Sequence, residues 1–433
     1  MIKQYIRQAF TLMRQNRLFT GIYVLGTGLS IAFTMILFII LYIKFAPVYP
    51  EYNRDRMLVV GPVTVVGKQG VGYTTNIGVS PKCADLFRNL PHLDKVSLCC
   101  PLHNGFNNKV LLPELDREIP ASINFVDADY WKVFTFDFIS GRPFTEAAVE
   151  SNLSEAVITE DMAMRIFATT DVVGKNIILD GGKVKVKGVV KRVTAATPNT
   201  AADIFLPISF NGINKTDENQ KGLVGNFVCY LLAKSEGDKD ALRNEVIETV
   251  KKYNDADKDY TSNLMGQPDE YWKSSLRGVG EEEKDVMNTI RTILYVLFAL
   301  LIIPAMNLCG MNASRMEERM SEIGVRKAYG ASNRSLMMQI LTENFLLTLI
   351  GGIIGLVFAY VVAFSSGNLI IHLFDSFVMP NSVSTDITME MLLNPTLFVI
   401  VLLICLVLNV LSAVIPAMAA LRHPIINAIQ TKR

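Results

Sequence analysis

Residues 18–43 read LFTGIYVLGTGLSIAFTMILFIILYI and contain no charged side chain over 26 positions. A helix needs about 20 mostly apolar residues to cross the hydrocarbon core of a bilayer. Three further stretches are long enough: residues 292–314 and 395–421 carry no charge, and residues 336–371 carry one carboxylate, Glu343. The sequence therefore predicts an integral membrane protein with four transmembrane α-helices.

Basic residues predict how these helices are oriented, because Lys and Arg in short flanking segments favour the cytoplasmic side. Residues 1–17, 315–334 and 422–433 are rich in Lys and Arg, whereas residues 372–394 contain neither. Both termini are therefore expected in the cytoplasm, with residues 44–284 outside it. The predicted segments are a cytoplasmic amphipathic N-terminal segment (1–17), helix one (18–43), a large extracytoplasmic domain (44–284), helix two and its approach (285–314), a cytoplasmic elbow (315–334), helix three (335–371), an outer loop (372–394), helix four (395–421) and a cytoplasmic tail (422–433).

Composition excludes several other functions. The 433 residues are 50% hydrophobic, and the formal net charge of +1 gives no electrostatic reason to expect a nucleic-acid partner. The six cysteines form no C-x-x-C pair, so a cysteine metal framework is not expected. A disulfide in the outer domain stays open as an alternative to buried core positions for Cys83, Cys99, Cys100 and Cys229.

The large outer segment alternates β-rich and helical runs, which predicts an α+β domain inserted between helices one and two. Strands are expected at residues 57–66, 95–100, 156–159, 176–179, 183–193 and 226–233, and helices at residues 80–90 and 238–253. Ser80 is expected to cap the first of these helices. Residues 254–284 are polar and are interpreted as the connection back to the membrane.

No catalytic site is predicted in this domain. It has only two histidines, His92 and His103, and neither a nucleophile elbow nor clustered metal-ligand spacing. Lys183, Lys185 and Lys187 alternate at strand spacing and share one face, which predicts either a solvated sheet face or a contact with anionic lipid headgroups.

The predicted elbow carries the most informative motif. The order of residues predicts a mixed-charge helix over 313–329, a left-handed cap at Gly330 and a new helix capped by Ser332. Its core reads Glu322-x-Gly324-x-Arg326-x-x-x-Gly330, and further matches lie at Gln339-x-x-x-Glu343, Gly351-Gly352-x-x-Gly355, Pro416-Ala417-x-x-Ala420 and Pro424-Ile425-x-x-Ala428. Together these motifs resemble FtsX/MacB-type ABC transporter permeases of the bacterial inner membrane.

Weaker matches to the MacB-like periplasmic core domain lie in the outer segment, at residues 51–56, 129–130, 140–144, 156–160 and 173–175. The resemblance implies that the elbow docks on a cytoplasmic ABC ATPase subunit and transmits its closure to the outer domain. The coupling residues that it implies are Arg315, Glu322, Gly324, Arg326, Lys327 and Gly330. Without the resemblance, a solvated juxtamembrane helix would be the simpler interpretation.

The resemblance also predicts the partners. A second permease copy or paralogue, a periplasmic adaptor and membrane lipid are expected beside the ATPase subunit. The sequence has no Gly-Lys-Ser or Gly-Lys-Thr, which a phosphate-binding Walker loop requires, so ATP is expected to bind to a separate subunit and no cofactor to this chain. Efflux of a peptide, antibiotic or lipid is the expected activity; lipoprotein release and control of cell-wall hydrolases are alternatives within the family, and a membrane receptor or scaffold is the alternative outside it.

Two features of the predicted spans each have two possible interpretations. Glu343 is either a functional relay or a side chain that reaches the interface and pairs with an Arg, because an isolated carboxylate in the bilayer is costly. Small-residue pairs allow close helix approach, either within the chain or between two copies. These pairs are Gly26 with Ser30, Gly28 with Ala32, and Gly351 with Gly355.

Overall fold

The chain divides into two compact units. A computed structural model describes residues 17–68, 73–75, 78–102, 109–112, 117–179, 181–194, 196–210, 222–277, 283–318, 320–366 and 395–422, with residues 7 and 11. The helical unit comprises Met1–Tyr42, Thr292–Ile370 and Ile387–Arg433, and the outer unit comprises Ile43–Arg291 and Ile371–Asp386. The outer loop 372–394 and nearly all of the predicted segments 1–17 and 422–433 lie outside the described residues.

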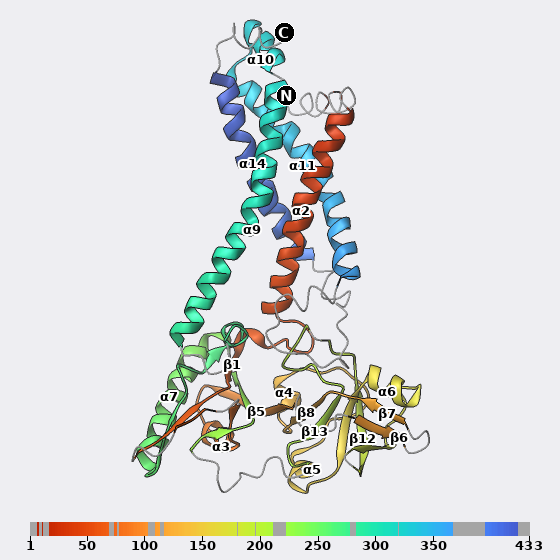
Figure 1. Cartoon of the computed structure of the whole chain (residues 1–433), viewed down its shortest axis with the longest axis vertical. Coiled ribbons are helices and arrows are strands. Elements are labelled where there is room, and N and C mark those ends of the chain that lie inside the picture. Colours follow the sequence, from red (N-terminus) through yellow and green to blue (C-terminus); the bar gives the residue numbers. More distant parts are fainter. Residues whose placement is uncertain are drawn as a thin grey trace. The chain divides into compact units, whose positions relative to one another are not determined.

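Long helices dominate the helical unit (Figure 1). They are α2 (Arg17–Phe45), α9 (Glu283–Glu318), α11 (Asn333–Ser365) and α14 (Pro395–Arg422), with the shorter α10 (Met320–Ala328) before α11. Within the described residues, three segments are long and apolar enough to cross a membrane: Thr20–Phe45, Asn333–Ser365 and Val399–Met418. The predicted second span lies within α9, of which Val286–Ala299 qualifies as a shorter apolar helix, so the fourth span stays a prediction.

The outer unit mixes short helices with seventeen described strands. The helices are η1 (Arg54–Arg56), α3 (Lys82–Phe87), α4 (Tyr130–Val133), α5 (Glu146–Glu150), α6 (Glu160–Phe167), η3 (Glu236–Asp238), α7 (Lys239–Ala256) and α8 (Tyr271–Ser274). The strands are β1 (Met57–Val60), β2 (Thr64–Gly67), β3 (Tyr73–Thr75), β4 (Gly78–Val79), β5 (Leu93–Leu102), β6 (Lys109–Leu112), β7 (Arg117–Pro120), β8 (Ile123–Val126), β9 (Phe138–Gly141), β10 (Glu155–Thr159), β11 (Asn176–Leu179), β12 (Gly182–Val190), β13 (Ile204–Pro207), β14 (Val224–Gly225), β15 (Val228–Ala233), β16 (Tyr260–Asn263) and β17 (Asp269–Glu270).

Twelve of these strands form one mixed sheet. Its order is β17-β1-β15-β5-β8-β13-β10-β12-β11-β6-β7, and β9 pairs with β12. The pairs β10–β12 and β8–β13 are parallel, while β1 pairs antiparallel with both β15 and β17. Strands β1, β8, β10 and β13 are buried along their whole length, as expected where both faces of a sheet are covered. The shortest strand of this sheet, β17, lies at one edge, directly before α8.

The structure confirms the α+β prediction and corrects three details. The predicted strand 57–66 is two strands, β1 and β2, because Gly61 and Pro62 interrupt it. The first predicted helix is the shorter α3, and its N-cap is Pro81; Ser80 is buried and its side chain makes no cap. The polar connection 254–284 also contains β16, β17 and α8, which the sequence interpretation missed.

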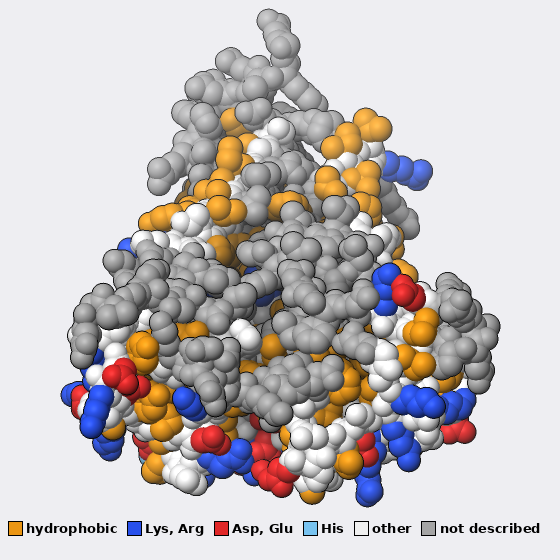
Figure 2. All heavy atoms as spheres, turned by 60° about the horizontal axis from the view of Figure 1, so that its bottom comes forward, with side chains coloured by type: hydrophobic (Ala, Val, Ile, Leu, Met, Phe, Trp, Pro, Cys, Tyr) orange, Lys and Arg blue, Asp and Glu red, His pale blue; other side chains and the backbone are white. Residues whose placement is uncertain are grey.

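The surface of the outer domain carries charges of both signs. On the face shown in Figure 2, Lys and Arg are interspersed with Asp and Glu and with apolar side chains. On β12, Lys183 and Lys185 are exposed, and the half-buried Lys187 forms an ion pair with Glu155 (2.8 Å). The predicted alternation on this strand is therefore confirmed, and one of its three lysines is already paired within the domain.

Candidate functional site

The predicted elbow forms a tight helix–turn–helix. Helix α10 ends in a Schellman motif, in which the amide of Gly330 donates to Lys327 O (2.9 Å) and that of Ala331 donates to Arg326 O (3.0 Å). Gly330 has φ +88°, a left-handed conformation that favours glycine. The Ser332 side chain then caps α11 by accepting from the amide of Ser335. Both predicted caps are confirmed.

One face of α10 is fixed to α11. Ile323 is buried against Leu336 and Ile340 of α11 and Ala417 of α14. Beside it, the Arg326 guanidinium donates to Gln339 Oε1 (2.7 Å), which adds a polar contact between the two helices. The turn therefore cannot swing freely on α11, because apolar and polar contacts join α10 to α11 and a further apolar contact joins it to α14.

The outer face of α10 presents apolar side chains. Val325 is exposed, and Tyr329, four residues later and so on the same face of the helix, is 89% exposed. Exposed tyrosines are frequent anchors in protein interfaces. The elbow thus combines a fixed base with an apolar outer face.

The predicted coupling residues divide into three groups. Arg326 and Lys327 are half-buried on α10, and Arg326 makes the bond to Gln339. Gly324 is buried, and Gly330 forms the left-handed cap. The side chains of Arg315 and Glu322 lie outside the described residues. The coupling role of all six residues stays a prediction.

Glycines bring α2 and α11 into close contact. A Cβ atom at Gly355 would lie 2.4 Å from Gly28 O, and one at Gly351 would lie 2.4 Å from Thr27 Oγ1. These approaches exist only because both residues lack a side chain. The described small-residue contact is therefore made within one chain. Earlier in α11, Glu343 is 2% exposed and lies among protein atoms.

A buried polar cluster closes the C-terminal end of α2. The Arg54 guanidinium donates through Nη1 to Ile43 O (2.8 Å) and Ala46 O (2.7 Å), and through Nε to Glu51 Oε2 (2.9 Å). Glu51 also accepts from the Tyr271 hydroxyl and from Thr200 Oγ1 (3.0 Å). We call Glu51, Arg54, Thr200 and Tyr271 the α2 cluster.

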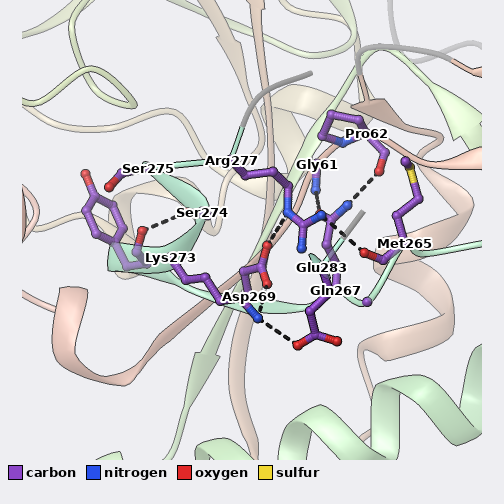
Figure 3. Close-up of polar contacts among 12 residues, drawn as sticks. Gly61, Pro62, Met265, Gln267, Asp269, Lys273, Ser274, Ser275, Arg277 and Glu283 are labelled. Atoms are coloured by element: carbon purple, nitrogen blue, oxygen red, sulfur yellow. Dashed lines mark hydrogen bonds and ion pairs between the residues drawn. The ribbon is translucent and has the colours of Figure 1, made fainter. Parts of the chain in front are cut away.

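A second ionic cluster meets the first residue of α9 (Figure 3). Lys273 lies between two carboxylates, 2.8 Å from Glu283 Oε1 and 3.5 Å from Asp269 Oδ1. Asp269 is 1% exposed and accepts from Arg277 Nε (2.5 Å), while Arg243 lies 3.1 Å from Glu283. We call Arg243, Asp269, Lys273, Arg277 and Glu283 the α9 cluster.

The pKa shifts agree with these contacts. Hydrogen bonds from Lys273 and Arg243 lower the pKa of Glu283, so the carboxylate stays charged. Burial raises the pKa of the Tyr271 hydroxyl; Arg54 opposes this shift and Glu51 adds to it, and the net result keeps Tyr271 protonated as a donor. Burial alone would lower the pKa of Arg54, but Tyr271 and Glu51 outweigh it and the pKa is raised.

Sequence reasoning missed most of both clusters. It singled out Glu51 only as part of a weak family match, and it interpreted residues 254–284 as a polar connector. Asp269, Lys273 and Arg277 are each four residues apart, but Asp269 lies on β17 and Arg277 lies beyond α8, so helical spacing gave no usable signal for this cluster. Glu51 and Tyr271 are 220 positions apart in the sequence, so only the tertiary fold brings them together.

In the described part of the chain, the possible metal ligands are scattered and the outer-domain cysteines are buried. The described residues contain no grouping of three or more His, Cys, Asp or Glu suited to a metal ion. The cysteines left open above, Cys83, Cys99, Cys100 and Cys229, are all buried free thiols. Burial raises the pKa of the Cys83 thiol to about 12, so it is not a reactive thiolate at neutral pH.

Comparison with known proteins identifies both halves of the chain. A family model described as MacB-like periplasmic core domain matches residues 20–249, and one described as FtsX-like permease C-terminal matches residues 293–425. The uncharacterized ABC transporter permease YknZ of Bacillus subtilis is 23% identical over 57% of this chain and 58% of its own length. The macrolide export ATP-binding/permease protein MacB of Vibrio parahaemolyticus is 24% identical over 65% of this chain and 40% of its own.

Further similarities are more distant. The pyoverdine export ATP-binding/permease protein PvdT of Pseudomonas savastanoi is 22% identical over 62% of this chain and 39% of its own length. The solved periplasmic region of MacB from Actinobacillus actinomycetemcomitans aligns at 14% identity and a TM-score of 0.31, covering 47% of this chain and 89% of that one. The chain spans less than two thirds of the length of the three curated relatives. On the family models, the chain belongs to the MacB/FtsX-type permeases of ABC transporters, which are multi-pass inner-membrane proteins with a large domain outside the cytoplasm.

Proposed function

We propose that this permease couples ATP hydrolysis by a separate cytoplasmic ABC ATPase subunit to a movement of its outer domain. The observation that carries the proposal is the elbow, which is fixed to α11 through Ile323 and Arg326 but exposes Val325 and Tyr329. A rigid helix end with an apolar outer face is suited to fit a groove on a partner and to transmit its displacement.

The proposed topology has four spans with both termini in the cytoplasm. The three candidate spans in the described residues and the distribution of Lys and Arg support it. The apolar part of α9 would supply the remaining span. In this topology the elbow and the outer domain lie on opposite sides of the membrane, so a signal between them must travel along helices.

Mechanical transmission fits the helices better than a polar passage. The glycine contact joins α2 and α11 closely, so these two helices would move together. The described carboxylate of α11, Glu343, is buried among protein atoms. We therefore propose that substrate is moved by the outer domain, with a second permease copy or paralogue and a periplasmic adaptor as further partners in a lipid bilayer.

The proposed activity is efflux of a peptide, an antibiotic or a lipid. Two relatives are named for macrolide export and pyoverdine export, and those names describe these relatives. For this chain, they favour efflux of an organic molecule from the outer compartment over the two alternatives within the family, lipoprotein release and control of cell-wall hydrolases.

Copurification tests the coupling. A tagged full-length chain is purified from membranes, and the amount of bound ABC ATPase is measured for wild type and for Val325→Ser with Tyr329→Ser. Losing interface anchors commonly costs about 2 kcal/mol, or roughly thirtyfold in affinity. We expect that loss with normal expression, because both side chains are exposed.

Two controls separate docking from folding of the elbow. Arg334→Gln changes an exposed charge next to the turn and should leave ATPase binding unchanged. Gln339→Leu breaks the bond to Arg326 while keeping the Arg326 charge, and should weaken binding only through a loosened α10. Wild-type binding by the double variant would refute docking at this face, and copurification of a kinase in place of an ATPase would favour the receptor alternative.

A further inference from the structure

We propose that α8, with β17 before it, is the joint through which the outer domain holds the ends of two membrane helices, α2 and α9. This inference rests on the proposed function and deepens it, because it names the residues that pass a helix movement into the domain. The evidence for this inference is the pair of ionic clusters. Each cluster binds the end of one helix, and α8 contributes a side chain to both.

The hold on α2 is made through backbone. Arg54 donates to Ile43 O, a carbonyl of the last turn of α2, where the helix itself supplies no partner, and to Ala46 O, directly after the helix. Glu51 fixes Arg54, and the Tyr271 hydroxyl fixes Glu51. The Arg54 guanidinium also lies over the Tyr271 ring, 4.6 Å from its centre. The end of α2 is thus connected to the first residue of α8 by an unbroken chain of bonds.

The hold on α9 is made through its first residue. Glu283 pairs with Lys273 of α8 and with Arg243 of α7. Lys273 in turn lies against Asp269 of β17. Tyr271 and Lys273 are two residues apart on a helix of four residues, so a pull on either helix end acts on the same rigid turn.

The joint is fixed to the main sheet. Strand β17 pairs with β1 through Asp269 with Val59 and Glu270 with Leu58. Gln267, just before the strand, donates to Pro62 O and accepts from the amide of Gly61, both at 2.6 Å (Figure 3). A displacement of α8 would therefore move the edge of the twelve-stranded sheet, which extends across the outer domain.

Burying charged groups in a protein core carries a large desolvation penalty. Replacing a buried ion pair by apolar residues is often neutral or stabilising, so Arg54 at 4% exposure and Asp269 at 1% are not explained by stability alone. Directional bonds, unlike apolar contacts, fix one orientation of the groups that they join. A joint that must pass on movement requires such an orientation.

Gly266, beside the α9 cluster, allows the backbone to pack closely against the first residue of α9. Gly266 has φ +85°, and a Cβ atom there would lie 2.7 Å from Cβ of Glu283. The carbonyl of Gly266 accepts from Arg243, the second partner of Glu283. The backbone before β17 therefore packs directly on the first residue of α9, and no side chain fits between them.

Hydrogen exchange on the full-length permease with its ATPase, in nanodiscs, tests the joint. Exchange is compared without nucleotide and with ATP plus vanadate, at elbow amides 323–332 and at outer-domain amides of α7. Wild type should respond at both places. Glu283→Gln and Gly266→Ala alter the two residues of the contact between the α9 start and the backbone before β17. Both variants should keep the nucleotide-dependent change in exchange at the elbow and lose the change in the outer domain. Tyr271→Phe should do the same from the α2 side.

Controls separate folding, the joint and the proposed function. The pair Lys109–Glu118 is exposed and remote in sequence, so Glu118→Gln should respond as wild type does. Unchanged nucleotide-free exchange in the variants shows that the domain is folded. If exchange at the elbow and in the outer domain still changes with nucleotide in all three variants, the joint is overturned but the proposed function is not. If exchange at the wild-type elbow does not change with nucleotide, the proposed function is overturned.

Discussion

A single arginine shows how this permease ends a membrane helix. Helix carbonyls at a C-terminus need partners, and a glycine-based turn usually supplies them. Here a buried guanidinium does so, since Arg54 donates to Ile43 O in the last turn of α2 and to Ala46 O just after it. The arrangement depends on Glu51, because an unpaired cation in this place would be strongly destabilising.

Arg54→Met is therefore expected to destabilise the protein by about 3–5 kcal/mol, because it leaves the Glu51 carboxylate buried without its cation. Thermal unfolding of the purified chain in detergent measures the effect. Arg192→Gln is the matched control: Arg192 pairs with Asp161 at the surface, where a lost ion pair costs about 0–1 kcal/mol. Equal midpoints for Arg54→Met and wild type would show that the α2 cluster contributes nothing to stability.

Glu283 gives the α9 cluster a defined pH dependence. Lys273 and Arg243 lower its pKa in the folded protein below the ordinary value of 4.5. The resulting stabilisation is present above 4.5 and is lost as the pH falls through the lower, folded-state pKa. Unfolding midpoints of wild type and Glu283→Gln should therefore differ at pH 7 and converge as the pH falls below 4.5. A difference that stays constant across this range would contradict the pairing.

At the scale of elements, local signals were sufficient for the elbow and insufficient for the joint. Gly330 and Ser332 determine a turn by their own conformational and capping preferences, so the sequence alone predicted it. Strand β17 has two residues and α8 has four, too few for any periodicity to reveal. Their place follows from pairing with β1, more than 200 positions earlier.

The contact between α2 and α11 can be tested with two neighbouring glycines. Gly355→Ala places a Cβ atom 2.4 Å from the backbone oxygen of Gly28, so the helices must separate. Overpacking of this kind typically costs about 1–3 kcal/mol, and we expect a lower unfolding midpoint in detergent. Gly352→Ala meets the ends of two flexible side chains, Leu402 at 2.9 Å and Ile31 at 3.8 Å, and should cost less. If the two substitutions are equally tolerated, these helices are not in close contact.

At the scale of the whole molecule, the proposed topology predicts which surfaces reagents can reach. Asp240 on α7 is exposed, so an Asp240→Cys variant should react with an impermeant thiol reagent in intact spheroplasts. The four cysteines of the outer domain are buried and can be kept, with the wild-type chain as the background control. Arg334→Cys, at the elbow, should react only after lysis. The reverse pattern would place the large domain in the cytoplasm.

The most direct test of the coupling follows the outer domain while ATP is hydrolysed on the other side of the membrane. A fluorophore at position 240 of the full-length permease, assembled with its ATPase in nanodiscs, reports movement of α7. The fluorescence should change on addition of ATP and stay unchanged both with a hydrolysis-deficient ATPase and with Val325→Ser and Tyr329→Ser in the elbow. Full ATP turnover with no fluorescence change in the wild-type complex would contradict the account.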